Sequence, residues 1–409
     1  MIETFNPQTS LLLRGMKNMK ILRLQKMAGS DHVLLKRTKR HIGGTLIILA
    51  AIAISMQPVF GGVKTKIDDT KWFDIGVRVQ TWYQAVGVNE GPDLNDFQIR
   101  RFYLYTEGQV VKDVTFFAHI GGDRLGQDGL FSPNTGAGVG NGFALRDGWI
   151  AYSPANEFKI QMGRMYIPFN RASGTVSTFA LLTLDLPLAQ GGVRPVTGAP
   201  YYPSTAGRDE GVTVWGNLGK GFLQYRVGIF DGQNSQKRPR TAARISINPL
   251  EKETTWFNRG NYLGAGKVLS IGAGFDRQPG LAGSNTSDYS AWTTDVFFDH
   301  PVKTGAVTLE WAYTGIRNSA TLGDAKTWYL QGGVLLPPLS SQVRIQPYVK
   351  YESIYRRTAS DFDYAGGGVN ILFNGHNLKL TLEYDKVLNE VDTYGSMDHH
   401  FTAGLQVLF

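Results

Sequence analysis

From Trp72 onward, apolar and polar residues alternate with a period of two. The alternation is regular in residues 307–314 (VTLEWAYT), 343–352 (VRIQPYVKYE) and 378–385 (LKLTLEYD). Because successive side chains of a strand point to opposite faces, each segment predicts a strand with one apolar and one polar face. No amphipathic helix is indicated in this part of the chain, so the pattern predicts an all-β fold.

The alternation predicts sixteen strands, each about as long as the ~9–11 residues that cross a bilayer as a tilted strand. They cover residues 72–83, 97–108, 111–122, 143–154, 156–164, 209–217, 221–231, 240–249, 265–276, 288–300, 304–316, 325–336, 342–355, 362–373, 376–388 and 397–409. An even number of strands places both ends of this region on the same side of a membrane. The sequence therefore predicts a transmembrane antiparallel β-barrel of sixteen strands.

The connections between these segments alternate between long and short. Long ones cover 84–96, 123–142, 165–208 and 277–287, whereas short ones cover 109–110, 155, 218–220, 301–303 and 374–375. Long external loops and tight periplasmic turns are typical of outer-membrane barrels. The third external loop, 165–208, is the longest. Residues 250–264 are long where a short turn is expected, and the sequence gives no reason for this.

A soluble all-β sandwich or solenoid is the alternative fold, because half-buried soluble strands alternate too. The loop rhythm favours the barrel, and so does the final segment, HFTAGLQVLF, which ends on Phe409. A closing strand with a terminal Phe is a common assembly signal of outer-membrane barrels. We therefore expect Phe409 to be read by the barrel assembly machinery, and outer-membrane lipid to surround the folded chain.

The amino-terminal region has the pattern of an export signal. Basic residues 36–40 precede an uncharged run from 41 to 63 with an apolar centre at 45–56. We interpret residues 1–61 as a signal peptide region cleaved after Gly61, followed by a barrel domain at 62–409 in the bacterial outer membrane. A transmembrane anchor of roughly twenty residues is the alternative. Because the basic flank is unusually long, we expect translation to start later, at Met27.

The net charge of +8 belongs mostly to this leader. Residues 1–41 hold nine of the 42 Lys and Arg residues and two of the 34 acids, so 33 bases and 32 acids remain. The mature chain is close to neutral, and nucleic-acid binding is not indicated. The absence of cysteine excludes disulfides and cysteine-ligated metal. We expect no metal and no cofactor.

A barrel of sixteen strands leaves a water-filled lumen, so the candidate functional residues are those that line it. The long loop 165–208 holds Arg171 and Arg194 and has a less polar middle at 179–188. A loop of this length is usually functional. We expect it either to fold inward and narrow the pore or to cover a subunit contact.

Arg100 and Arg101 lie where the alternation changes phase. Phe97 and Ile99 are apolar at odd positions, while Phe102 is apolar at an even one. A β-bulge between the arginines would turn both side chains inward. Without the bulge, one arginine would face lipid, which costs ~2–4 kcal/mol near the bilayer midplane. The alternative is that Phe97 and Ile99 lie at the rim, where a single arginine reaches the headgroups.

Several short motifs resemble the family of phosphate-selective porins O and P. They are residues 97–102 (FQIRRF), 145–152 (LRDGWIAY), 162–169 (MGRMYIPF), 207–212 (GRDEGV) and 227–232 (VGIFDG). The resemblance implies a sixteen-stranded outer-membrane channel, usually a homotrimer, which favours anions through basic residues at a constriction. It also implies that Arg100 and Arg101 match the family's paired arginines, that Arg164 is its Gly-Arg position, and that Asp123 tempers the basic constriction.

The charge balance departs from what a phosphate pathway requires. The further lumen candidates Arg226, Arg344 and Lys350 are accompanied by the acids Glu310, Glu352, Glu383 and Asp385. The sequence thus predicts a porin for passive diffusion of small solutes, with a preference for small anions such as phosphate or chloride. Phosphate selectivity is a hypothesis.

Two other classes of function stay open. An outer-membrane barrel enzyme needs a positioned nucleophile and base, yet no histidine lies in a recognisable serine-hydrolase motif. We therefore predict no catalytic residue and no enzyme activity. A passive envelope or adhesion protein is the other alternative, and channel recordings would distinguish it from a porin.

Overall fold

The structure is a computed structural model. It describes residues 62–88, 93–125, 143–190, 207–232, 238–282, 287–319, 322–340, 342–357, 361–389 and 397–409. These residues belong to one compact unit, 58–409. None of the helices among them is long and apolar enough to cross a bilayer. The predicted signal region, residues 1–61, and the predicted start at Met27 lie outside the described residues.

Sixteen antiparallel strands, β2 to β17, close into a ring. Each pairs with the next along the chain, and β17 pairs back with β2, with Leu405 opposite Thr81. The strands are β2 (Trp72–Val88), β3 (Leu94–Val111), β4 (Val114–Leu125), β5 (Ala144–Tyr152), β6 (Lys159–Tyr166), β7 (Arg208–Leu218), β8 (Leu223–Phe230), β9 (Arg240–Ile247), β10 (Val268–Ala282), β11 (Ser287–Val302), β12 (Gly305–Ser319), β13 (Gly323–Leu335), β14 (Arg344–Arg356), β15 (Phe362–Asn374), β16 (Leu378–Val387) and β17 (Met397–Leu408). The ring confirms the predicted sixteen-stranded barrel.

A further strand, β1 (Val63–Lys66), was not predicted. It pairs with Trp72–Ile75 at the start of β2, beyond the point where Phe409 pairs with Val77. All four residues of β1 are exposed, so no buried face imposes an alternating pattern on them.

The two faces of the ring differ in polarity, as the alternation predicts. Phe97 and Val349 are 68% and 69% exposed on the outer face. Their neighbours in sequence, Gln98 and Lys350, are buried on the inner face. An apolar outer wall and a polar inner wall are the arrangement that lipid outside and water inside require.

The predicted bulge between the two arginines of β3 is confirmed. Arg101 pairs with Gln80 and Ile99 pairs with Thr81, which leaves Arg100 as an extra residue in the strand. Both arginine side chains are buried on the inner side of the ring. The bulge therefore lets two consecutive side chains share a face that normally takes every second residue.

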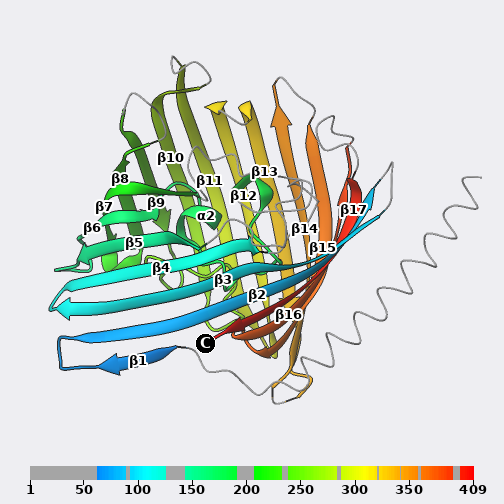
Figure 1. The fold of residues 1–409 in the computed structure, drawn as a ribbon, viewed down its shortest axis with the longest axis horizontal. Coiled ribbons are helices and arrows are strands. Elements are labelled where there is room, and N and C mark those ends of the chain that lie inside the picture. Colours follow the sequence, from blue (N-terminus) through cyan, green and yellow to red (C-terminus); the bar gives the residue numbers. More distant parts are fainter. Residues whose placement is uncertain are drawn as a thin grey trace, which may run out of the picture. The chain divides into compact units, whose positions relative to one another are not determined.

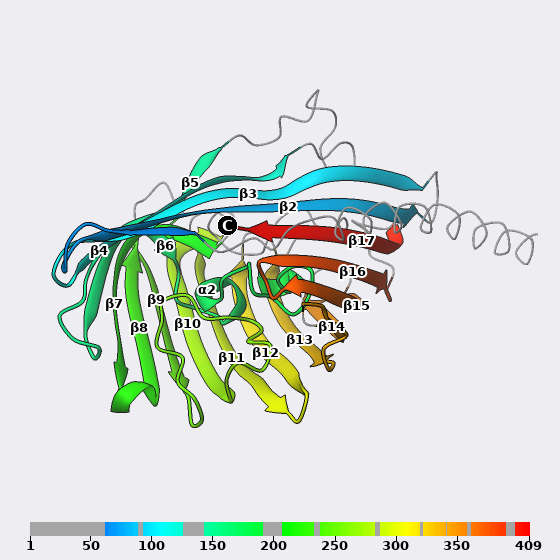
Figure 2. The same ribbon diagram turned by 90° about the horizontal axis from the view of Figure 1, so that it is seen from below.

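Two segments of chain lie inside the ring. The first, residues 167–190, follows β6, contains the short helix α2 (Ala172–Thr175), and is called the inner loop. The second, residues 248–264, follows β9 at the end of the barrel with short connections, and is called the inner turn. Figures 1 and 2 both show α2 surrounded by strands. The inner loop confirms the predicted inward fold for the described part of 165–208.

Candidate functional site in the barrel interior

The inner loop has a defined local structure. Asn170 Oδ1 accepts hydrogen bonds from the backbone N–H groups of Ser173 (3.0 Å) and Gly174 (3.2 Å), which satisfies donors at the start of α2. Four apolar side chains of the loop then pack together: Ala172, Val176, Leu181 and Leu186. These apolar contacts stabilise the conformation of the loop and explain its low polarity.

Asp185 connects the inner loop to the arginine pair of β3. Its carboxylate accepts hydrogen bonds from Arg100 Nη2 (2.7 Å) and Arg101 Nη2 (2.5 Å). Arg100 Nη1 also lies 3.4 Å from Asp123 Oδ1, and Arg146 Nη2 lies 2.6 Å from Asp123 Oδ2. Three guanidinium groups thus share two carboxylates. The bulge brings the predicted arginines together, and their charge is largely offset by Asp185 and Asp123.

Acids on β14 and β16 hold the inner loop through its backbone. The N–H of Leu184 donates to Glu383 Oε2 at 3.0 Å, and the N–H of Leu188 donates to Glu352 Oε2 at 2.5 Å. Hydrogen bonds to ionised acceptors are stronger than those to neutral acceptors, so these acids fix the loop to this part of the wall.

Lys350, a predicted lumen residue, faces the interior from β14. Its Nζ lies 2.8 Å from Glu383 Oε1 and 3.0 Å from Asp385 Oδ1. Two carboxylates surround one ammonium group, so this part of the wall does not present a free positive charge.

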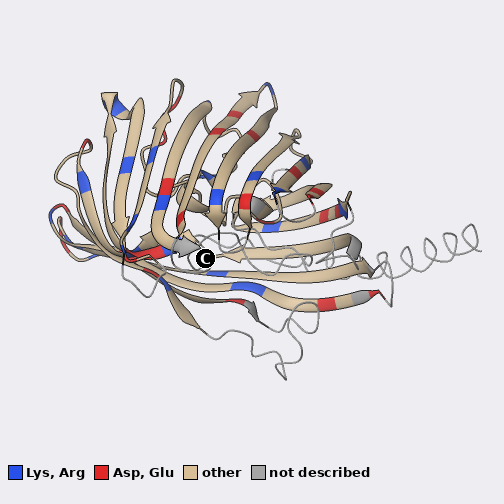
Figure 3. Ribbon diagram, turned by 90° about the horizontal axis from the view of Figure 1, so that it is seen from above, with Lys and Arg blue, Asp and Glu red and all other residues tan. Residues whose placement is uncertain are grey.

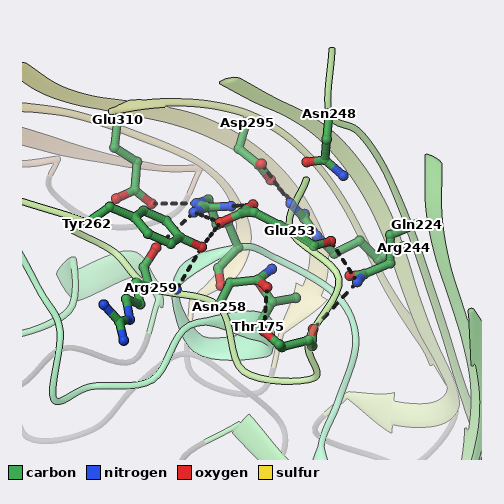
Figure 4. A network of polar contacts seen from close by, with 12 residues as sticks. Thr175, Gln224, Arg244, Asn248, Glu253, Asn258, Arg259, Tyr262, Asp295 and Glu310 are labelled. Atoms are coloured by element: carbon green, nitrogen blue, oxygen red, sulfur yellow. Dashed lines mark hydrogen bonds and ion pairs between the residues drawn. The ribbon is translucent and has the colours of Figure 1, made fainter. Parts of the chain in front are cut away.

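The inner turn meets the inner loop at a buried ion pair. Arg171 Nη1 lies 2.6 Å from Glu253 Oε2, and Arg171 Nη2 donates to Glu253 Oε1 at 2.8 Å. Tyr262 OH donates to Glu253 Oε1 at 2.8 Å, and Figure 4 shows Tyr262 and Glu310 on the same side of this network. Burial alone raises the pKa of Glu253, but the charge and hydrogen bonds of Arg171 outweigh burial and hold the pKa below its usual range.

Backbone hydrogen bonds reinforce this contact. The N–H of Asn258 donates to Thr175 O at 2.7 Å, and the N–H of Ser177 donates to Asn258 O at 3.0 Å. Val176 and Asn258 form an isolated parallel bridge between the two segments. The inner loop and the inner turn therefore act as one structure inside the barrel. This explains why residues 250–264 are long.

Arg226 on β8 faces the interior between two indole rings. Its Cζ lies 4.5 Å from the ring centre of Trp256 and 5.7 Å from that of Trp215. Its hydrogen bonds go to Gln224 Oε1 at 2.9 and 3.0 Å and to Thr255 O at 3.1 Å. All these acceptors are neutral, so no carboxylate in the described part of the chain bonds to this guanidinium.

A cavity of about 240 Å³ lies between the inner loop, the inner turn and the wall, and Arg78, His119, Asp147 and Arg208 contribute to its lining. Arg208 Nε donates to Asp147 Oδ2 at 2.9 Å, and His119 Nδ1 lies 2.8 Å from the same oxygen. Arg78 Nη2 donates instead to Thr178 Oγ1 at 2.8 Å. Arg78 therefore brings a positive charge to this cavity without a bonded carboxylate in the described part of the chain.

Most charges of the inner wall are paired across neighbouring strands. Arg244 Nη1 lies 2.7 Å from Asp295 Oδ2, and Arg240 pairs with Asp276. Figure 3 shows basic and acidic segments on neighbouring strands. The near-neutral composition is thus arranged as ion pairs. Among the described residues of the inner wall, Arg78, Arg226 and Lys379 donate hydrogen bonds to neutral oxygen atoms and not to carboxylates.

The remaining predicted residues are not near the Asp185 cluster or the Arg171 pair. Arg164 Nη1 lies 2.5 Å from Glu210 Oε1, whose side chain is 53% exposed. Arg344 Nη2 donates to the carbonyl oxygens of Thr304 and Leu336, each at 3.3 Å, at the end with short connections. Arg344 thus stabilises turns at this end of the barrel, and its predicted part in ion selectivity stays a prediction. Arg194 lies outside the described residues.

Sequence reasoning missed several residues of this site. Asp185 is the only charged residue in the apolar stretch 179–188, which was a usable signal. Arg78 occupies a polar position of an alternating strand, and the same rule would have found it. Glu253 lies in the segment that the sequence left unexplained. Among the residues that the structure describes, no three His, Asp or Glu side chains are arranged to hold a metal ion.

The family described as phosphate-selective porin O and P matches residues 73–266 of the chain. The match confirms the resemblance inferred from the motifs, and its range includes the bulge on β3, the inner loop and the inner turn. A protein of Aquifex aeolicus (strain VF5), described as uncharacterized, is 22% identical over 253 residues. That alignment covers 55% of this chain and 58% of the relative, which is less than two thirds of its length.

Solved structures with a similar fold are porins and channels. OmpF of Salmonella typhi, in complex with daunomycin, has a TM-score of 0.58 at 14% identity, covering 85% of this chain and all of the other. The outer membrane channel DcaP of Acinetobacter baumannii has a TM-score of 0.52 at 14% identity, covering 86% and 100%. The anion-selective porin from Comamonas acidovorans has a TM-score of 0.51 at 13% identity, covering 83% and 100%. At these identities the likeness shows the fold, which is that of a porin-type outer-membrane barrel.

Proposed function

Since residues 73–266 match the phosphate-selective porins O and P, we propose that this chain forms a water-filled channel for passive diffusion of small solutes and ions across the outer membrane. The closed ring with a polar inner wall supports the proposal, because sixteen strands enclose more space than side chains fill. The inner loop and the inner turn narrow that space from within.

We further propose that the channel weakly prefers anions such as chloride or phosphate. The observation that carries this preference is Arg78, which lines the interior cavity and bonds to the neutral hydroxyl of Thr178. Lys379 donates to the carbonyl oxygen of Leu181 at 3.2 Å and adds a second positive charge on a nearby strand. Cations without a bonded carboxylate attract anions to a narrow pathway, and the acids Glu107 and Asp147 in the same cavity lining moderate that attraction.

The preference is weak because acids face the same interior. Glu310 accepts from Tyr329 OH (2.8 Å) and Gln331 Nε2 (2.9 Å), and it stays 3.9 Å from Arg171. The Glu310 carboxylate thus accepts hydrogen bonds mainly from neutral donors, which do not cancel its negative charge. With charges of both signs along the wall, strict phosphate selectivity is a secondary hypothesis.

Reversal potentials in a KCl gradient across planar bilayers test this function. We expect a modest chloride preference in the unchanged protein, and a shift toward potassium in Arg78→Gln combined with Lys379→Gln. Lys303→Gln is the control, since Lys303 is exposed in the connection between β11 and β12. An unchanged reversal potential in the double variant would reject these residues, and a protein without conductance would favour a passive envelope role.

Phosphate selectivity has its own measurement. If phosphate binds in the pathway, added phosphate should inhibit the chloride current at concentrations far below those of chloride. Sulfate at equal charge and ionic strength is the control. Equal inhibition of the chloride current by phosphate and sulfate would indicate a general preference for anions and reject selectivity for phosphate.

The resemblance also supports a homotrimeric assembly. We propose that the barrel forms trimers in the membrane, which native mass measurement of the detergent-extracted protein would test. A mass of one chain would reject the trimer while leaving the channel proposal intact.

A further inference from the structure

A row of large side chains crosses the outer face of the barrel near the end that carries the long connections. The register places Phe275 opposite Trp292, Trp292 opposite Gly315, Gly315 opposite Lys326, and Lys326 opposite Tyr355. Trp292 is 52% exposed, and Phe275 and Tyr355 are also exposed. Aromatic side chains at this height are typical of the membrane–water interface.

These residues surround a hollow of about 820 Å³ on the outer wall, which we call the rim hollow. Gly315 lies in the middle of the row and keeps the hollow open. A Cβ at this position would come within 2.5 Å of Trp292 Nε1, so any larger residue would displace the indole. The ring of Tyr313 lies 5.3 Å from that of Trp292 and completes an aromatic side of the hollow.

Two cations of the rim hollow lack bonded acids. Arg317 and Lys326 are exposed, and neither forms a hydrogen bond or an ion pair with another described residue. They lie on a diagonal of the β12–β13 pair, a separation of about 7–8 Å between neighbouring positions. Long side chains at this separation can reach one common anion.

The acids beside them are already engaged. Asp324 Oδ2 lies 3.2 Å from Arg357 Nη1, and Asp324 Oδ1 accepts from the N–H of Asn318 at 3.0 Å. Asp361 Oδ1 accepts from the N–H of Arg356 at 3.1 Å. The lining of the rim hollow contains four basic residues, Arg317, Lys326, Arg356 and Arg357, and two acids, Asp324 and Asp361, so the local charge is positive.

The position of Lys326 limits the height at which the membrane lies. On a lipid-facing wall, a lysine costs about 2–4 kcal/mol at the midplane but about 0–1 kcal/mol near the interface. Lys326 is three residues from the start of β13, close to the external rim. Lys326 lies within the row itself, and its flexible stem lets the ammonium group reach the level of the headgroups.

We propose that the rim hollow binds the phosphate-bearing headgroup of a lipid in the outer leaflet. Arg317 and Lys326 bind the phosphate, and Phe275, Trp292 and Tyr355 contact the first part of the acyl chains. Charge complementarity selects a phosphorylated lipid, and the exposed aromatic side chains beside the cations favour an apolar chain attached to that phosphate. This site is on the outside of the barrel, so it does not depend on the proposed conductance.

Lipid binding to the purified barrel tests the proposal. The probe is bis-phosphorylated lipid A in zwitterionic micelles, with binding followed by native mass spectrometry and by the rise in melting temperature. Each basic residue near a membrane surface contributes about 1 kcal/mol, so Arg317→Gln with Lys326→Gln should weaken binding about 25-fold. Gly315→Leu, which fills the hollow and leaves both charges in place, should weaken it too.

The matched control is Lys112→Gln with Lys303→Gln, two exposed lysines at the opposite rim. This variant should bind the lipid as the unchanged protein does. Equal losses in both double variants would overturn the proposal, because they would indicate unspecific charge attraction. Inorganic phosphate that competes as well as the lipid would also overturn it, since it would identify a site for a free anion.

Discussion

Arg171 and Glu253 join two segments that enter the barrel from its opposite ends. Arg171 belongs to the inner loop and Glu253 to the inner turn, and both side chains are 1% exposed. The guanidinium makes two hydrogen bonds to the carboxylate and a third, of 3.0 Å, to Arg259 O. The placement of the inner loop inside the barrel thus depends on a contact between segments that are 82 residues apart in sequence.

The first prediction concerns this pair. Glu253→Gln keeps the size of the side chain but leaves the Arg171 charge buried, which costs about 3–5 kcal/mol in comparable pairs. Glu310, at 3.9 Å, is too far away to replace the lost hydrogen bonds. We expect lower stability of the inner loop, faster proteolysis within residues 167–190 and larger, noisier single-channel currents.

The control is Glu210→Gln, which breaks the half-exposed pair with Arg164. Exposed pairs contribute about 0–1 kcal/mol, so this variant should leave proteolysis and currents unchanged. The interpretation of the buried pair as a connection would be wrong if Glu253→Gln behaved like this control. A double variant, Arg171→Met with Glu253→Leu, should recover part of the stability because no charge stays unpaired.

The second prediction concerns Asp185. Asp185→Asn removes the carboxylate that offsets Arg100 and Arg101, so the surroundings of the arginine pair gain one positive charge. We expect the reversal potential in a KCl gradient to shift toward chloride. Neutralising both arginines in the same background should reverse the shift, which would assign the selectivity to the arginine pair.

Asp288→Asn serves as the control for Asp185. Asp288 also pairs with an arginine, Arg277, at 2.7 Å, but both side chains are exposed at the rim. The Asp288→Asn variant should leave the reversal potential unchanged. If Asp185→Asn gave no shift either, the pathway for ions would not pass the arginine pair.

The strands could be predicted from the sequence because lipid and water impose opposite demands on the two faces of every strand. All sixteen strands, and the bulge at Arg100, leave a direct mark in the alternation. The inward fold of the long loop could be expected too, from its length and its apolar middle. These features depend on local pattern alone.

The partners of the arginines could not be predicted, because they depend on which loop residue meets which strand. Asp185 and Arg100 are 85 residues apart, and only the folded ring brings them together. The inner turn shows the same limit: its length was visible in the sequence, but its purpose depends on Arg171 on another segment. Arg344 shows a further limit, because alternation gives the face of a residue and not its height in the barrel.

The third prediction concerns His376, between β15 and β16. His376 Nε2 lies 2.9 Å from Asn261 O of the inner turn. Burial and the neighbouring charge of Lys379 lower the pKa of this imidazole from 6.5 to about 3. Protonation of His376 thus favours a state in which the inner turn has separated from this imidazole. Stability that is present above pH 6.5 is lost as the pH falls toward 3, by at most about 1.4 kcal/mol per pH unit.

The measurement is the melting temperature of the barrel, or the proteolysis rate of the inner turn, between pH 6.5 and 4.5. Glu253 contributes only below this window, because its pKa is lowered from 4.5 and its stabilising effect is lost at more acid pH. His376→Gln should therefore flatten the curve within the window. His300→Gln, at a partly exposed histidine of β11, should not, and equal slopes in all three proteins would refute the assignment.

The last prediction separates assembly from stability at Phe409. Its backbone closes the ring through two hydrogen bonds with Val77, of 2.6 and 2.8 Å, while its side chain is 45% exposed. Phe409→Ala keeps both hydrogen bonds and removes an apolar group that is only half buried. The melting temperature of assembled barrels should therefore change little. If the assembly machinery reads the side chain, the amount of heat-resistant barrel in the outer membrane should fall severalfold.

Phe97→Ala is the matched control, since Phe97 is an outward-facing phenylalanine away from the chain end. It removes a similar lipid contact without changing the closing strand. A fall in yield for Phe409→Ala alone assigns the side chain to recognition during assembly. Equal yields in both variants would mean that lipid contact decides, and that the closing strand is recognised through its backbone and its alternating pattern.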